Sequence, residues 1–174
     1  MNLRSTIKSI QDIMRKDDGV DGDAQRIGQL TWMLFLKIFD QCEEAWEDDA
    51  ADQRKQYKSP IPEDCRWRNW AKYIEDDNGK KKPRIQASEL IKHVNDIVFP
   101  GLQQLDIDGN PKAKVVRDVF QDTNNYMKSG TQMLAVIEKL DEAVNFHDIK
   151  SRGQLGDVYE QILNDLRSAG NAGE

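Results

Sequence analysis

Apolar residues recur along this chain at intervals of three and four positions, the spacing that gathers side chains on one face of an α-helix. The pattern predicts helices over residues 3–16, 23–48, 87–99, 112–121, 131–144 and 152–167. No segment alternates apolar and polar residues for long enough to predict a β-strand. We therefore expect an all-α fold, a multi-helix bundle of about six to eight helices with one long connection.

Residues 23–48 are expected to form the central helix, because their apolar side chains surround most of its circumference instead of forming one stripe. Each face of such a helix needs a neighbour that excludes water. Asp23 is the expected N-cap, since a short carboxylate can accept a hydrogen bond from a free N–H group of the first turn. The charged residues that follow Cys42 are expected to emerge into water.

Two other helix ends carry local signals. Pro100 and Gly101 are expected to break or end the helix predicted over residues 87–99, because proline lacks an N–H and clashes with the preceding turn. Ser129 or Thr131 can cap the helix predicted over residues 131–144.

Residues 50–85 are expected to form the long connection, partly ordered, with one short helix near residues 67–73. Basic side chains in it are interleaved with Trp67, Trp70 and Tyr73. The candidates for DNA contact among these basic residues are Arg66, Arg68, Lys80, Lys81, Lys82 and Arg84. Arginine and lysine neutralise phosphates and tryptophan stacks on bases. Equally, the tryptophans can anchor the connection to the bundle while the lysine run forms a solvated tip.

The charge of the chain restricts how it can meet a nucleic acid. Its 174 residues, the length of one domain, carry a net charge of −6, whereas a protein that binds nucleic acid alone is usually basic. Contact with DNA would therefore need a local basic patch or a partner. The acidity alternatively serves only to keep the domain soluble.

Motifs that carry chemistry are missing from the sequence. Neither phosphate-binding glycine motif is present, and a calcium loop that begins at Asp17 would have Gly28 where its last ligand must be a glutamate. Cys42 and Cys65 form no CxxC motif, and they indicate a reducing compartment. We expect no catalytic, cofactor-binding or metal-binding residues. No segment is long and apolar enough to predict a membrane span.

Three stretches together carry a family resemblance. They read LTWMLFLKIFD at residues 30–40, RWRNW at residues 66–70, and GQLGDVYEQIL at residues 153–163, with AGNAGE following at residues 169–174. In this order and spacing, the chain resembles the N-terminal domain of the modification subunit of type I restriction-modification systems.

The resemblance implies that residues 1–168 are a helical, non-catalytic domain and that residues 169–174 begin a linker to a methyltransferase domain. The full-length subunit would use S-adenosylmethionine to methylate adenine N6 in double-stranded DNA, in the cytoplasm, with a specificity subunit and a restriction subunit as partners. Leu155, Tyr159 and Leu163 are the candidates for packing on the methyltransferase domain. The alternative is a stand-alone helical protein-interaction module or regulator.

Overall fold

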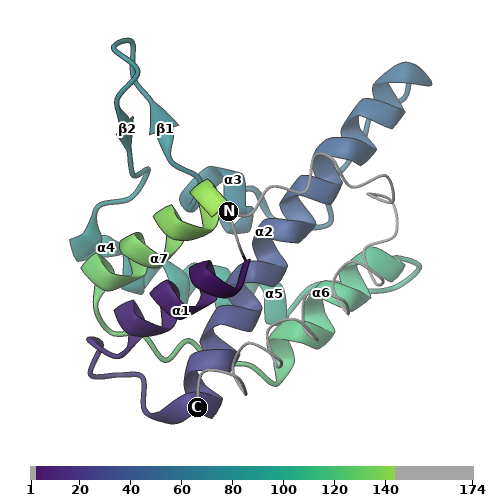
Figure 1. Cartoon of the computed structure of the whole chain (residues 1–174). Coiled ribbons are helices and arrows are strands. Elements are labelled where there is room, and N and C mark those ends of the chain that lie inside the picture. The colour runs from purple at the N-terminus through teal and green to yellow at the C-terminus, as the bar shows by residue number, and fades with distance from the viewer. Residues whose placement is uncertain (1–2, 144–174) are drawn as a thin grey trace.

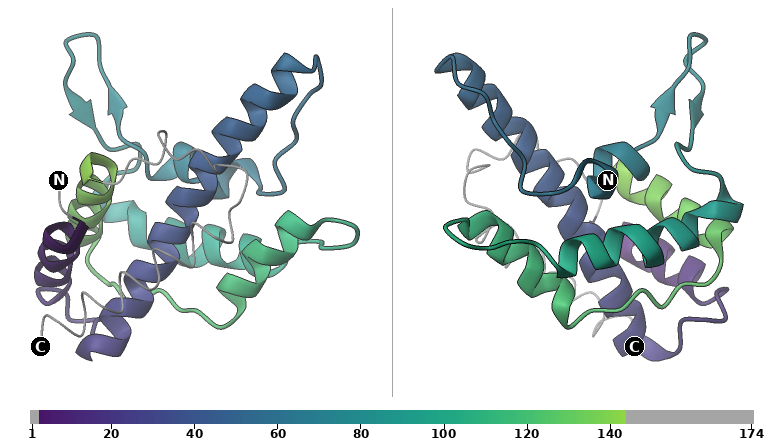
Figure 2. Two further views of the ribbon diagram at one scale, coloured as in Figure 1. Left: turned by 45° about the vertical axis from the view of Figure 1, so that its right-hand side comes forward. Right: turned by 180° about the vertical axis from the view of Figure 1, so that it is seen from behind.

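The central element of the fold is α2 (Gly22–Asp52), which runs diagonally through the molecule (Figure 1). The computed structural model describes residues 3–143. Helices α1 (Leu3–Met14) and α7 (Gly130–Ala143) lie side by side on one flank of α2, and α6 (Pro111–Gln121) lies on the other (Figures 1 and 2). The predicted all-α class is confirmed.

Helix α2 is central because it is buried on all sides over the middle half of its length. From Gln29 to Glu43, every side chain is buried except those of Thr31 and Gln41, which are half-buried. Trp32 is at the centre of an aromatic cluster that joins α2 to three other elements. Its ring contacts are with Phe99 at 4.9 Å between centroids, Phe120 at 6.0 Å and Trp70 at 6.4 Å. Such clusters contribute strongly to core stability.

The prediction that Asp23 caps α2 is wrong. Asp21 has the extended backbone of the N-cap position, and Asp23 lies inside the first turn. The carboxylate of Asp23 forms an ion pair with Arg26. The N–H of Asp21 instead donates to the side chain of Gln25 at 2.7 Å.

The long connection is more ordered than the sequence predicts. After α2 it forms η1 (Glu63–Cys65), α3 (Trp67–Trp70), and a two-stranded antiparallel hairpin of β1 (Ile74–Glu75) and β2 (Lys81–Lys82). The strands escaped prediction because two residues are too few to show an alternating pattern. The tryptophans of α3 are almost completely buried, at 2% and 1% exposed, which confirms that they anchor the connection to the bundle.

The helix around residues 87–103 does not end at Pro100. It runs as α4 (Ala87–His93), a π-helical turn η2 (Val94–Val98) and α5 (Phe99–Gln103). The prediction of a break was wrong because the wider π turn comes just before the proline and lets the chain continue. Gly101 allows α5 to pack closely, since an added Cβ would lie 2.7 Å from the Sγ atom of Cys65.

The starts of α6 and α7 follow the local rules. The side chain of Asn110 accepts a hydrogen bond from the N–H of Ala113 at 3.1 Å, and a proline occupies the first helical position of α6. Of the two cap candidates for α7, Ser129 is the one whose hydroxyl accepts from the N–H of Gln132, at 3.2 Å.

Part of the predicted C-terminal region is outside the described residues. The helix expected over residues 152–167 and its packing candidates Leu155, Tyr159 and Leu163 belong to it. Within residues 3–143, no helix has the length and apolar character needed to cross a membrane.

Candidate functional site

The hairpin carries the lysine run and projects away from the helices (Figures 1 and 2). Its turn is held by Asp76, whose carboxylate accepts hydrogen bonds from the backbone N–H groups of Asn78 at 2.9 Å and Lys80 at 2.8 Å. Gly79 has a φ of +78°, which a residue with a side chain rarely adopts. The sequence therefore builds a defined turn that presents the lysines on a fixed support.

The lysines of the hairpin do not all face the same way. Glu75 pairs with Lys81 across the two strands, and Ile74 pairs with Lys82. Because successive residues of a strand point to opposite faces, Lys81 shares a face with Glu75, whereas Lys82 lies on the other face with Ile74. The side chains of Lys80–Lys82 and of Arg84 are exposed, so the structure leaves these four residues accessible.

The structure gives Arg66 and Arg68 a different position. Both guanidinium groups lie against carboxylates of α2, in a cluster of Asp40, Glu43, Glu47, Arg66 and Arg68 that we call the arginine clasp. Arg66 Nη2 lies 2.7 Å from a carboxylate oxygen of Glu47, and Arg68 Nε lies 2.7 Å from one of Asp40. Their side chains are 10% and 23% exposed, so their charges stabilise the connection against α2. DNA contact by these two arginines stays a prediction.

Burial and hydrogen bonding act oppositely within the arginine clasp. Glu43 is completely buried, and this burial raises the pKa of its carboxyl, although hydrogen bonds from Ser59 and Tyr57 and the charge of Arg66 act to lower it. Burial also acts to raise the pKa of Glu47, but hydrogen bonds from Arg68 and Arg66 outweigh it and lower that pKa.

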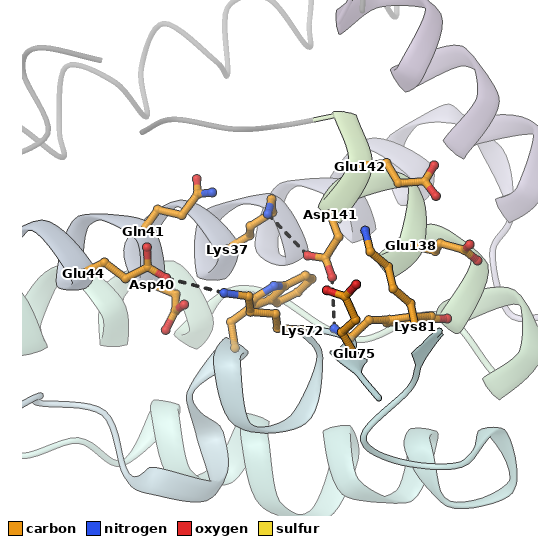
Figure 3. Close-up of a pocket in the computed structure, with 12 residues that line it drawn as sticks. Lys37, Asp40, Gln41, Glu44, Lys72, Glu75, Lys81, Glu138, Asp141 and Glu142 are labelled. Atoms are coloured by element: carbon orange, nitrogen blue, oxygen red, sulfur yellow. Dashed lines mark hydrogen bonds and ion pairs between the residues drawn. The ribbon is translucent and has the colours of Figure 1, made fainter. Parts of the chain in front are cut away.

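A pocket of about 260 Å³ lies beside the clasp, between α2, α3, the hairpin and α7 (Figure 3). We call it the α2–α7 pocket. Helix α2 contributes residues at helical spacing along one face, and α7 contributes acidic residues one turn apart. Its lining is Lys37, Asp40, Gln41, Glu44, Trp67, Lys72, Tyr73, Glu75, Lys81, Glu138, Asp141 and Glu142. Figure 3 shows Lys81 extending from the hairpin toward the α7 residues.

Inside the pocket, Asp141 connects α7 to the other elements. Its carboxylate lies 3.4 Å from the ammonium group of Lys37 and accepts a hydrogen bond from the backbone N–H of Tyr73 at 3.2 Å. The Lys37 side chain is only 7% exposed, and this burial lowers its pKa, an effect that the charge of Asp141 partly offsets. The pocket is thus a polar site with one buried cation.

The side chains of Cys65 and His93, two further residue types that can carry out chemistry, lie against other parts of the fold. The Cys65 thiol is buried, which raises its pKa to about 12, so it carries no thiolate near neutral pH. The Nε2 atom of His93 lies 2.9 Å from the backbone oxygen of Asp64. Among the described residues, no group of three or more His, Cys, Asp or Glu side chains is arranged to hold a metal ion.

Sequence reasoning missed the α2–α7 pocket and the arginine clasp. The available signal was a pair of charged residues, Lys37 and Asp40, within an otherwise apolar stretch of the central helix. A buried charge needs a partner, which predicts polar contacts at this level of the bundle. The partners lie on the connection and on α7, and the spacing along α2 does not identify them.

Comparison with known proteins agrees with the resemblance. The family model described as the HsdM N-terminal domain matches residues 3–145. The chain is 51% identical, over 176 residues, to the methylase subunit of the type I restriction enzyme EcoEI from Escherichia coli, and the alignment covers 100% of this chain and 33% of that protein.

Two solved structures are similar to the whole bundle. One is described as a modification subunit of a type I restriction enzyme from Vibrio vulnificus, with a TM-score of 0.68 and 26% identity, covering 95% of this chain and 35% of that one. The other comes from work on complex assembly and conformational transition of the type I R-M system, with a TM-score of 0.66 and 30% identity, covering 94% of this chain and 30% of that one. The chain thus spans about a third of the length of these relatives.

Proposed function

Because this chain belongs to the HsdM N-terminal domain family, we propose that it is the non-catalytic N-terminal domain of a type I restriction-modification methylase subunit. In this role it supports assembly with the specificity subunit and closure of the complex around DNA. The observation that carries the proposal is the match of the whole chain to the E. coli methylase subunit, of which the aligned part is only 33%.

The full-length subunit, in this proposal, transfers a methyl group from S-adenosylmethionine to adenine N6 after the base has been flipped out of double-stranded DNA. A methyltransferase domain outside this chain supplies the cofactor site and the catalytic residues. The specificity subunit reads the sequence, the restriction subunit joins for cleavage, and the complex works in the cytoplasm. Leu155, Tyr159 and Leu163 remain our candidates for packing on the methyltransferase domain.

A graft tests the role in assembly. This chain replaces the aligned third of the E. coli methylase subunit, and the hybrid is mixed with the specificity subunit and DNA. We expect the hybrid to assemble and to methylate DNA, whereas the same subunit without any N-terminal domain does not. Equal activity of the two proteins would refute the assembly role.

Two further measurements test the remaining parts of the proposal. The 174-residue chain alone, given S-adenosylmethionine and DNA, should transfer no methyl group, and specific turnover would refute the non-catalytic assignment. A reading frame that continues after Glu174 into Phe-Tyr-Thr-Pro supports a methylase subunit. A stop codon at that point would favour the stand-alone interaction module.

We also propose that the outer face of the hairpin contacts DNA phosphates through Lys80 and Lys82, with Arg84 and Lys81 nearby. The support is the exposure of these side chains and the position of Lys82 on the face opposite Lys81. The double variant Lys80→Ala/Lys82→Ala should weaken DNA binding by the assembled complex and reduce its salt slope by about two, because each lost phosphate contact reduces the slope by about 0.9. Lys81→Ala is the matched control and should change the slope less. An unchanged slope in the double variant would make the hairpin a solvated tip.

A further inference from the structure

The α2–α7 pocket has more carboxylates than cations. Six carboxylate side chains line it, against the ammonium groups of Lys37, Lys72 and Lys81. Among the described residues, Glu138 and Glu142 of α7 form no hydrogen bond or ion pair with another side chain. Carboxylates that converge on a concave site concentrate a negative potential there, which attracts a cation.

Two polar atoms of the pocket lining are buried without a partner. The indole Nε1 of Trp67, a residue only 2% exposed, has no acceptor among the described residues, and the side-chain Oε1 of Gln41 has no donor. Buried polar groups are nearly always hydrogen-bonded, because leaving one unpaired costs free energy. Both atoms lie beneath neighbouring side chains, so a ligand reaches them only when those side chains move.

The size and chemistry of the pocket select an organic cation. Its volume of about 260 Å³ is below the roughly 300–1,000 Å³ typical of small-molecule sites, so it suits one side chain. The carboxylates of the described residues are not grouped as metal ligands. A guanidinium group offers five N–H donors, pairs with two carboxylates and stacks on aromatic rings, which the lining provides in Trp67 and Tyr73.

We propose that the α2–α7 pocket is a docking site for an arginine side chain presented by a protein partner. The guanidinium group pairs with Glu138 and Glu142, which are one helical turn apart on α7. Lys81 lies at this pocket and opposes a second cation. The site is separate from the DNA contacts proposed for Lys80 and Lys82, so either proposal can fail alone.

Titration of the 174-residue chain with small probes tests the site. N-acetyl-arginine amide should shift the NMR signal of the Trp67 indole N–H, assigned with Trp67→Phe, and saturate at millimolar concentrations. The neutral isostere N-acetyl-citrulline amide should bind at least about tenfold more weakly, a difference of about 1.4 kcal/mol. Equal binding of the two probes, or no binding of the arginine probe, would overturn the proposal.

Variants that remove either negative or positive charge from the pocket provide the second test. Glu138→Gln/Glu142→Gln should weaken binding of the arginine probe by about tenfold, because it removes charge-assisted hydrogen bonds, and Lys81→Met should strengthen it. Asp18→Asn/Glu89→Gln, which neutralises two exposed carboxylates outside the pocket, is the matched control and should leave binding unchanged. Equal effects of the two double variants would overturn the proposal. Tighter binding of free arginine than of the capped amide would identify a metabolite site and overturn the protein-partner assignment.

Discussion

Arg66→Met is a direct test of the arginine clasp. The substitution keeps much of the side-chain volume but removes the cation that lies 3.6 Å from Glu43, whose side chain is 1% exposed. Glu47 keeps its ion pair with Arg68 at 2.9 Å, so the substitution mainly leaves the carboxylate of Glu43 without a counter-charge. Removing one partner of a buried ion pair typically costs about 3–5 kcal/mol, and we expect a loss of stability of that size near pH 8.

The loss should depend on pH in a defined direction. Burial raises the folded-state pKa of Glu43, and removing Arg66 raises it further, because the charge of Arg66 acts to lower it. A group with a raised folded-state pKa contributes stability below its unfolded pKa, and that contribution is lost as the pH rises through the folded pKa. The stability gap between the variant and the parent should therefore be smaller at pH 5 than at pH 8.

Urea unfolding followed by tryptophan fluorescence measures this gap. Adding Glu43→Gln to Arg66→Met should recover most of the stability at pH 8, because a neutral amide needs no counter-charge and can still accept the hydrogen bond from Tyr57, which measures 2.8 Å. Glu43→Gln alone serves as the control. A loss that is equal at both pH values and is not rescued by Glu43→Gln would refute the charge-based account of the clasp.

Three further substitutions test close packing and a buried carboxylate. Gly130→Ala should lower the free energy of unfolding by about 3 kcal/mol, since the added Cβ would lie 1.8 Å from the backbone oxygen of Ala87. Gly28→Ala, whose Cβ would have its nearest contact at 3.7 Å, should stabilise α2 by about 0.5–1 kcal/mol. Equal melting temperatures of the two variants would contradict the clash. Asp17→Asn should lower the free energy of unfolding in urea by about 2 kcal/mol. The buried carboxylate accepts hydrogen bonds from three backbone N–H groups at 2.8–3.0 Å, whereas an amide has only one acceptor oxygen. An unchanged urea midpoint would contradict this prediction.

The sequence predicts those parts of the fold that depend on local periodicity. Helix α2 was identified because burial on all sides leaves apolar residues all round it, and α7 was identified with its Ser129 cap among two candidates. The predicted start of α2 is wrong because Asp21, and not Asp23, has the extended backbone of the N-cap position. The continuation through Pro100 was missed because a π turn depends on how the helix packs, which local sequence does not express.

The candidate sites were harder to predict because their contacts join residues distant in the chain. Arg66 and Arg68 read as basic residues next to tryptophans, like the lysine run, and only the fold separates the two sets. The two arginines pair with carboxylates about twenty to thirty positions earlier on α2. The side chains of Lys80 and Lys82 form no hydrogen bond or ion pair among the described residues. Composition counts all four as positive charge, but in the structure the two arginines pair with carboxylates and the two lysines are exposed.

This separation bears on how a domain of net charge −6 would contact DNA in the complex that we propose. The arginine clasp pairs Arg66 and Arg68 with carboxylates of α2, whereas the hairpin presents its lysines exposed. The two faces of the hairpin strands differ, because Lys82 is exposed on one face while Glu75 and Lys81 on the other face border an acidic pocket. A protein partner with an exposed arginine and the DNA backbone can therefore bind opposite faces of the same hairpin. The two proposals predict that Lys81→Met affects the arginine probe more than it affects DNA binding.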